Sequence, residues 1–210
     1  MSIDIKTIFT LIRIFAIVIL LLFSFGCNYS NSDSKNWPPI TLVGTLNVEK
    51  EVYKLGDTLV FSFIVPDSLP SLTTLGEKVK IHSLNEASLW FYLSEFDTLN
   101  KKILQITNVI PVNAISGNIQ MRNNTYFIGD FDVRNKPFAL SFAIILNKRG
   151  LFSIQNGDIR NFIANDGQYK AGLFFKLNTV SKNIHLVNKH FPQIVDSNLD
   201  LNFFYAFYVK

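Results

Sequence analysis

Three histidines, His82, His185 and His190, are the residues best suited to binding a metal ion. His185 and His190 lie five positions apart, whereas two ligands on one helix face follow an i, i+4 pattern. No cysteine lies beside them, and Asp196 would complete a ligand set only if the fold brought it close. The sequence therefore predicts no metal site and no cofactor, and we expect these histidines on the surface or in loops.

Carboxylates recur at strand spacing in two places, Glu49 with Glu51 and Glu95 with Asp97. Two carboxylates on one face could act as acid and base on a glycosidic bond, although such pairs are more often part of a solvated strand face. The chain also lacks the Gly-x-Ser-x-Gly nucleophile motif and the phosphate-binding Gly-x-x-x-x-Gly-Lys loop. We therefore predict that the protein is not an enzyme. The alternative is a hydrolase whose site is built from scattered loop residues.

Four amphipathic aromatic residues, Trp37, Trp90, Tyr53 and Tyr169, could form a stacking platform for sugars or peptides. Trp90 lies inside a predicted strand, residues 88–96. We therefore expect Trp90 to pack in the core rather than to bind a ligand.

Composition narrows the classes of partner. Eighteen basic and 15 acidic residues follow Cys27, a net charge of only +3, and no run of Lys or Arg could track a phosphate backbone. We therefore expect no nucleic-acid partner. With a single cysteine there is no intrachain disulfide, so stability must come from packing, to which 20 phenylalanines contribute.

The first 27 residues have the pattern of a secretory signal peptide. Lys6 and Arg13 precede an apolar run at residues 14–23, and Gly26 stands immediately before Cys27. As a helix, residues 14–25 would span about 18 Å, well short of the ~30 Å hydrocarbon core of a bilayer. An uncleaved anchor would have to recruit residues 8–12 and let Arg13 snorkel to the interface, and this alternative stays open.

Ser24-Phe25-Gly26-Cys27 resembles the lipobox of bacterial lipoproteins, in the relaxed form seen in Bacteroidota. The resemblance implies that signal peptidase II removes residues 1–26 and that Cys27 carries several acyl chains, enough for stable membrane attachment. It further implies a place in the cell envelope, anchored to the outer membrane. Only Asp33 follows as an acidic residue in the tether, so the side of that membrane stays open.

Three short motifs resemble the Asp-Ser/Thr-aliphatic acceptor pattern for O-glycosylation of exported Bacteroidota proteins. They are Asp57-Thr58-Leu59, Asp67-Ser68-Leu69 and Asp97-Thr98-Leu99. The resemblance implies possible O-glycosylation at Thr58, Ser68 and Thr98. An Asp-Thr pair also begins strands well, which is the alternative explanation.

Beyond Cys27, a polar segment at residues 27–36 predicts a flexible tether, and residues 37–210 form one folded domain. Short runs with period-two alternation predict about ten short antiparallel strands, with Phe142 and Ile144 in the core. Asn123-Asn124 and Asn156-Gly157 predict hairpin turns. Only residues 185–195 suggest a helical turn. The fold class is all-β, a β-sandwich.

Gly-Asp-Thr-Leu at residues 56–59 and the segment at residues 148–154 resemble the immunoglobulin-like domains of Bacteroidota surface lipoproteins. The resemblance implies an immunoglobulin-like β-sandwich, preceded by the signal-peptide helix. We therefore expect a non-enzymatic role in binding, adhesion or assembly, with the membrane reached through Cys27 and with other envelope proteins or glycans as partners. A flat aromatic or apolar patch on one sheet would favour this role, and a concave cluster of carboxylates and histidines would favour the hydrolase.

Overall fold

A computed structural model describes residues 36–71, 77–105, 110–157, 160–192 and 203–210. The predicted signal peptide (residues 1–26), Cys27 and all but the last residue of the predicted tether lie outside these ranges, as does Asp196. Within the ranges, no helix has the length and apolar character needed to span a membrane.

The described residues form fifteen strands and one five-residue helix, so the all-β prediction is confirmed and the predicted number of strands is too low. The extra strands include pieces of two or three residues, too short for alternation to reveal. The elements are β1 (Asn36–Leu46), β2 (Val52–Tyr53), β3 (Thr58–Ile64), β4 (Ser68–Pro70), β5 (Lys78–Lys80), β6 (Leu84–Asp97), β7 (Lys102–Gln105), β8 (Val112–Ser116), β9 (Asn118–Arg122), β10 (Tyr126–Asp130), β11 (Ala139–Ile145), β12 (Gly150–Asn156), β13 (Arg160–Ala164), β14 (Tyr169–Leu177), α2 (Ile184–Asn188) and β15 (Phe204–Val209).

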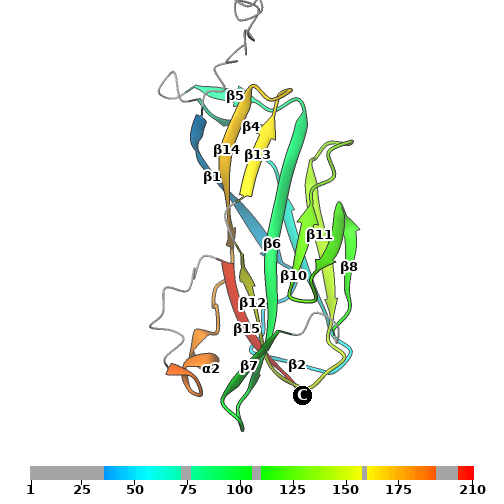
Figure 1. The fold of residues 1–210 in the computed structure, drawn as a ribbon, viewed down its shortest axis with the longest axis vertical. Helices are drawn as coiled ribbons and strands as arrows, with labels where there is room; N and C mark the ends of the chain where they lie inside the picture. The colour runs from blue at the N-terminus through cyan, green and yellow to red at the C-terminus, as the bar shows by residue number, and fades with distance from the viewer. Residues whose placement is uncertain (1–35, 72–76, 106–109, 158–159, 193–202) are drawn as a thin grey trace, which may run out of the picture. The chain divides into compact units, whose positions relative to one another are not determined.

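Two layers make up the sandwich (Figure 1). We call β9-β10-β6-β12-β15-β2 the first sheet, to which β7 is added beside β6, and β8-β11-β3-β1 the second sheet. β13 and β14 join the two sheets along one side, because β13 pairs with β6 and β14 pairs with β1. β4 and β5 form a separate hairpin. Most pairs are antiparallel, as predicted, but β1–β14 and β15–β2 are parallel.

The core follows from the alternation of the strands. In β3 and β11, every second residue is buried, including Phe61, Phe142 and Ile144, which are fully buried. Phe142 stacks on Phe61 of its own sheet and on Phe91 of β6, with ring centroids 5.2 and 4.6 Å apart. Phe91 in turn stacks on Phe127 of β10 at 5.1 Å. This row of rings joins the two sheets and confirms the predicted buried face.

The short helix α2 covers part of the outer face of the first sheet. Val187 of α2 and the nearby Phe191 pack with Phe96, Leu151 and Phe204 in a second, smaller apolar cluster. The predicted helical turn is therefore real, although it begins at Ile184 and residues 193–195 lie outside the described ranges. The outer face of the same sheet around β10 and the middle of β6 has a different, aromatic surface.

Candidate functional site

Trp90 lies on the outer face of β6, so the prediction that it packs in the core is wrong. Leu89, Phe91 and Leu93 are fully buried, whereas Trp90 and Tyr92 between them are only half-buried. Successive side chains of a strand point to opposite faces. The alternation that places Phe91 in the core therefore places Trp90 outside it.

Four side chains form a continuous group on this face, which we call the aromatic row: Arg160, Trp90, Tyr126 and Tyr92. The rings of Trp90 and Tyr126 stack with centroids 4.7 Å apart and an interplanar angle of 24°. Tyr92 and Tyr126 lie 6.0 Å apart at a tilt of 60°. The guanidinium of Arg160 lies over the Trp90 ring, a cation–π contact.

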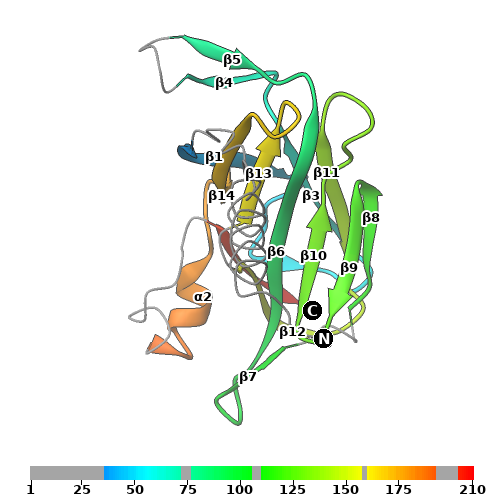
Figure 2. The ribbon, with the colours of Figure 1, turned by 45° about the horizontal axis from the view of Figure 1, so that its top comes forward.

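Strand pairing positions the aromatic row. β10 lies beside β6, with Phe127 opposite Phe91 and Ile128 opposite Trp90, and Figure 2 shows β9, β10 and β6 side by side. β13 lies along the other edge of β6 and brings Arg160. Gly157, just after β12, donates its N–H to the Trp90 carbonyl at 2.8 Å. A Cβ at Gly157 would lie 3.0 Å from the Trp90 Cβ, so a larger residue there would press on the row.

The geometry limits what the row can bind. Arg160 and Tyr126 approach Trp90 from strands on opposite sides of β6, so both faces of the indole are occupied. Stacking of a sugar ring needs an open aromatic face, and the contacts with Arg160 and Tyr126 take up the faces of the Trp90 ring. Trp, Tyr and Arg are the residues most enriched at the energetic centres of protein–protein interfaces.

Polar groups border the aromatic row on β9 and β10. Arg122, opposite Tyr126, donates from Nη2 to Oε1 of Gln120 at 2.7 Å. Asp130 stands on the same face of β10 as Tyr126, and burial raises the pKa of its carboxyl while the nearby Arg122 opposes that rise. The row thus has an apolar centre and a polar edge, the usual anatomy of an interface.

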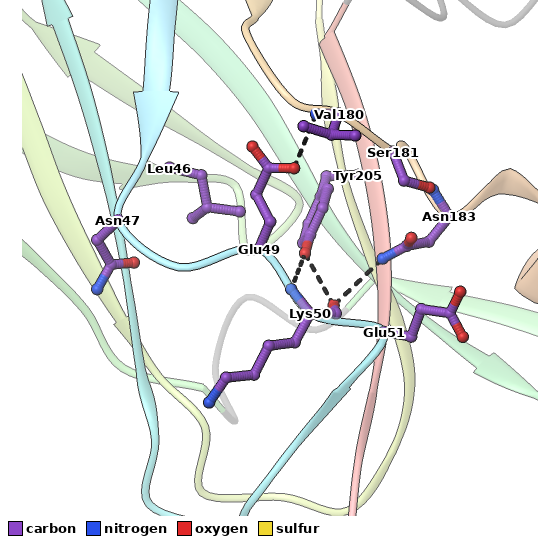
Figure 3. A pocket seen from close by; sticks show the side chains of 9 residues that line it. All are labelled: Leu46, Asn47, Glu49, Lys50, Glu51, Val180, Ser181, Asn183 and Tyr205. Carbon is purple, nitrogen blue, oxygen red and sulfur yellow. Dashed lines mark hydrogen bonds between the residues drawn. The ribbon is translucent and has the colours of Figure 1, made fainter.

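A second candidate is a polar pocket of about 490 Å³ at the loop between β1 and β2 (Figure 3). Its floor is the hydroxyl of Tyr205, which lies 2.9 Å from the hydroxyl of Tyr53. Burial raises the pKa of both tyrosines, so both hydroxyls stay protonated at neutral pH. A protonated hydroxyl does not act as a base.

The hydrogen bonds of this pocket hold the chain together. The backbone N–H of Lys50 donates to both tyrosine oxygens, at 3.0 Å for Tyr53 and 2.8 Å for Tyr205. The Lys50 carbonyl accepts from the Tyr205 hydroxyl at 2.8 Å and from the Asn183 amide at 3.2 Å. Asn183 also donates to the Ala206 carbonyl at 2.9 Å. The network fixes the β1–β2 loop against β15 and has a structural role.

The predicted carboxylate pairs also have structural partners. Glu49 accepts the backbone N–H of Val180 at 2.8 Å, and Glu51 lies 3.2 Å from His185. Glu95 forms an ion pair with Lys148 at 2.5 Å.

Asp97 caps the turn after β6. The N–H and side-chain amide of Asn100 are the main cause of a pKa below the usual value of its carboxyl. These engagements give the hydrolase alternative no support.

The histidines do not gather. His82 and His185 are exposed, and His190 is half-buried with its Nε2 3.1 Å from the Tyr208 hydroxyl. Among the described residues, no group of three or more His, Cys, Asp and Glu side chains is arranged to hold a metal ion.

The other predicted residues are placed as follows. Thr58 is exposed at the start of β3, Ser68 is half-buried at the start of β4, and Thr98 is half-buried in the β6–β7 turn. Their O-glycosylation stays a prediction.

Tyr53 and Tyr169 are core residues rather than platform residues, and the Trp37 side chain lies outside the described set. Tyr126, Tyr92 and Arg160 were missed, although alternation in residues 125–133 and 88–96 already placed the two tyrosines on the polar side.

No protein-family model matches the chain, and no curated protein matches it in sequence. Among solved structures, the chain is similar to the seventh ScaB type I cohesin from Pseudobacteroides cellulosolvens. The match has 10% sequence identity and a TM-score of 0.35, and it covers 68% of this chain and 89% of that one. A likeness at this level carries no inference about function.

Proposed function

We propose that this chain is a non-enzymatic envelope lipoprotein that binds another protein through the aromatic row. The observation that carries the proposal is the stack of Arg160, Trp90 and Tyr126 on an outer sheet face. Such a stack is already ordered before binding, so a partner that covers it pays little side-chain entropy. A protein partner is favoured over a glycan because both faces of the Trp90 ring are occupied.

The anchor is the other half of the proposal. Cys27, lipidated after removal of residues 1–26, would hold the domain at the outer membrane through the polar segment that follows. The support is the sequence alone: basic residues, a short apolar run, and a glycine before the only cysteine. Two or more acyl chains would keep the protein on the membrane while the domain binds its partner.

The binding site is tested by photo-crosslinking in cells that express the full-length chain. A photoreactive amino acid replaces Tyr92, and as a control it replaces Ile103, an exposed residue of β7. We expect a discrete protein adduct from position 92 alone. Trp90→Ala, added to the position 92 protein, should reduce the adduct at least about tenfold, since loss of a central aromatic residue costs ~2 kcal/mol or more. An adduct insensitive to Trp90→Ala, or equal adducts from both positions, would contradict the proposal.

A further inference from the structure

The outer face of the second sheet has no charged side chain among the outward positions that β3, β11, β8 and the end of β1 contribute. The polar outward residues are threonines, serines and one asparagine. The apolar ones include Val43, Val60, Ile64, Ala139, Ala143 and Ile145.

This composition is unusual for a surface. Solvent-facing positions of small soluble domains are about 25–35% charged, so several charges would be expected over four strands. The outer face of the first sheet, by contrast, has Arg122 and Asp130. The charge-free face ends at β14, where Lys176 lies opposite Val43. Val43 and Ile64 are nevertheless 53% and 54% exposed. In the part of the chain that the structure describes, the helix packs elsewhere, against β15.

Small side chains lie beside the aliphatic ones in the middle of the face. Ala139 lies opposite Ile64 and Ala143 opposite Val60, while between them the hydroxyl of Ser141 donates to that of Ser62 at 2.9 Å. Aliphatic side chains beside small ones can interdigitate with those of another sheet at the ~10 Å spacing of stacked sheets.

We propose that a second copy of this chain docks on the charge-free face, with the two second sheets packed face to face about a twofold axis. A twofold contact brings the patch of one copy against the same patch of the other, so a patch with a net charge would repel its copy. The chain as a whole carries a net positive charge. A patch without charged side chains meets its own copy without that cost. The interface goes beyond the proposed function, because the aromatic rows are on the other sheet and stay free on both copies.

The area predicts the strength of this association. Four strands about 4.8 Å apart and seven residues of about 3.3 Å give a planar patch of roughly 440 Å² per copy. Stable complexes bury about 800 Å² of accessible surface per partner. The dimer should therefore be reversible, with a dissociation constant in the micromolar range. The dimer would present two aromatic rows together, which raises the effective concentration of binding sites for a multivalent partner.

The experiment is sedimentation equilibrium of the full-length chain in a density-matched detergent, from about 1 to 500 μM. We expect the wild-type mass to rise towards that of a dimer. Ile64→Lys places like charges in the interface and should weaken association at least about tenfold. Ile103→Lys is the matched control, because Ile103 is a similarly exposed strand isoleucine (47%), and it should associate as the wild type does. A wild type that stays monomeric, or two variants that behave alike, would overturn the proposal.

A second measurement keeps the test decisive if Ile64→Lys fails to fold. In a Cys27→Ser background, Ala143→Cys places a thiol on the face, and Ile103→Cys places one on β7. A bis-maleimide that spans the ~10 Å between stacked sheets should link Ala143→Cys into dimers several times faster than Ile103→Cys. Equal rates, or faster linkage through position 103, would refute a dimer built on this face.

Discussion

Phe142 lies in the middle of the ring row that joins the two sheets, and its truncation is the sharpest test of the fold. The side chain is fully buried and stacks on Phe61 at 16° and on Phe91 at 9° between ring planes. Replacing Phe142 with alanine removes the ring from both contacts at once. Because Phe61 is in the same sheet and Phe91 is in the other, the cavity would open between the layers.

The expected loss can be worked out from these contacts. Truncating a buried phenylalanine to alanine costs about 3–5 kcal/mol. Each stacked aromatic pair adds ~0.5–1.5 kcal/mol beyond the buried area, and Phe142 takes part in two. We therefore expect Phe142→Ala to lower the free energy of unfolding by about 5 kcal/mol, a large part of the ~5–15 kcal/mol typical of a domain.

Urea unfolding, followed by the fluorescence of Trp37 and Trp90, measures this loss. With an m-value of about 2 kcal/mol/M, the midpoint should fall by roughly 2.5 M with little change in slope. Phe142→Leu keeps most of the volume and should cost far less, about 1.5 kcal/mol. Ile103→Ala, at an exposed position of β7, should change stability by no more than ~0.5 kcal/mol. A loss below about 1 kcal/mol for Phe142→Ala would refute the packing of the two sheets described above.

Three further predictions concern chemistry. Cys27→Ser should abolish labelling of the protein by a clickable palmitate analogue in cells, and equal labelling of mutant and wild type would rule out lipidation there. Burial raises the pKa of Tyr53 above its ordinary value of 10. Above pH 10, therefore, the unfolded chain loses a proton that the native state keeps. Stability should then fall as pH rises, and less steeply in Tyr53→Phe; parallel alkaline profiles by urea unfolding would contradict this. No metal site is predicted, so a chelator should leave the thermal midpoint of the purified chain unchanged. A metal that binds only the native state stabilises it, so a bound metal together with a chelator-induced drop of several degrees would refute this prediction.

The alternation of β3, β11 and β15 by itself determined which of their residues face the main core, although in β15 the residues between them, Phe204 and Ala206, are buried too, in the cluster under α2. Side chains of an extended strand point to opposite faces whatever the strand pairs with, so Phe61, Phe142 and Phe207 could be assigned to the core from period two alone.

Local turn chemistry was right at one of the two predicted hairpins. The hairpin predicted at Asn156-Gly157 is wrong, because β12 and β13 on either side of it both pair with β6 and not with each other. Asn123 and Asn124 both have positive φ, which asparagine tolerates, and form the predicted turn, although the pairing of Arg122 with Tyr126 leaves three residues in the loop instead of two.

Trp90 shows where the local pattern was given too little weight. Its alternation with Phe91 indicates the outer face, whereas the prediction of burial rests only on its position inside a strand. The neighbours of Trp90 could not be inferred in the same way. Arg160 reaches it only because β13 pairs with β6, and that pairing joins segments about seventy residues apart in the chain.

Which strands meet was decided by the tertiary structure. The parallel pairing of β1 with β14 and the covering of one sheet by α2 depend on contacts between distant segments, which no local pattern encodes. The charge-free face follows the same rule. Each strand alone shows only a few small or apolar outward residues, and they become a surface because β1, β3, β11 and β8 lie side by side. Sequence thus determined which side of the alternating strands faces the main core, and the non-local pairing of the strands decided what the other side became.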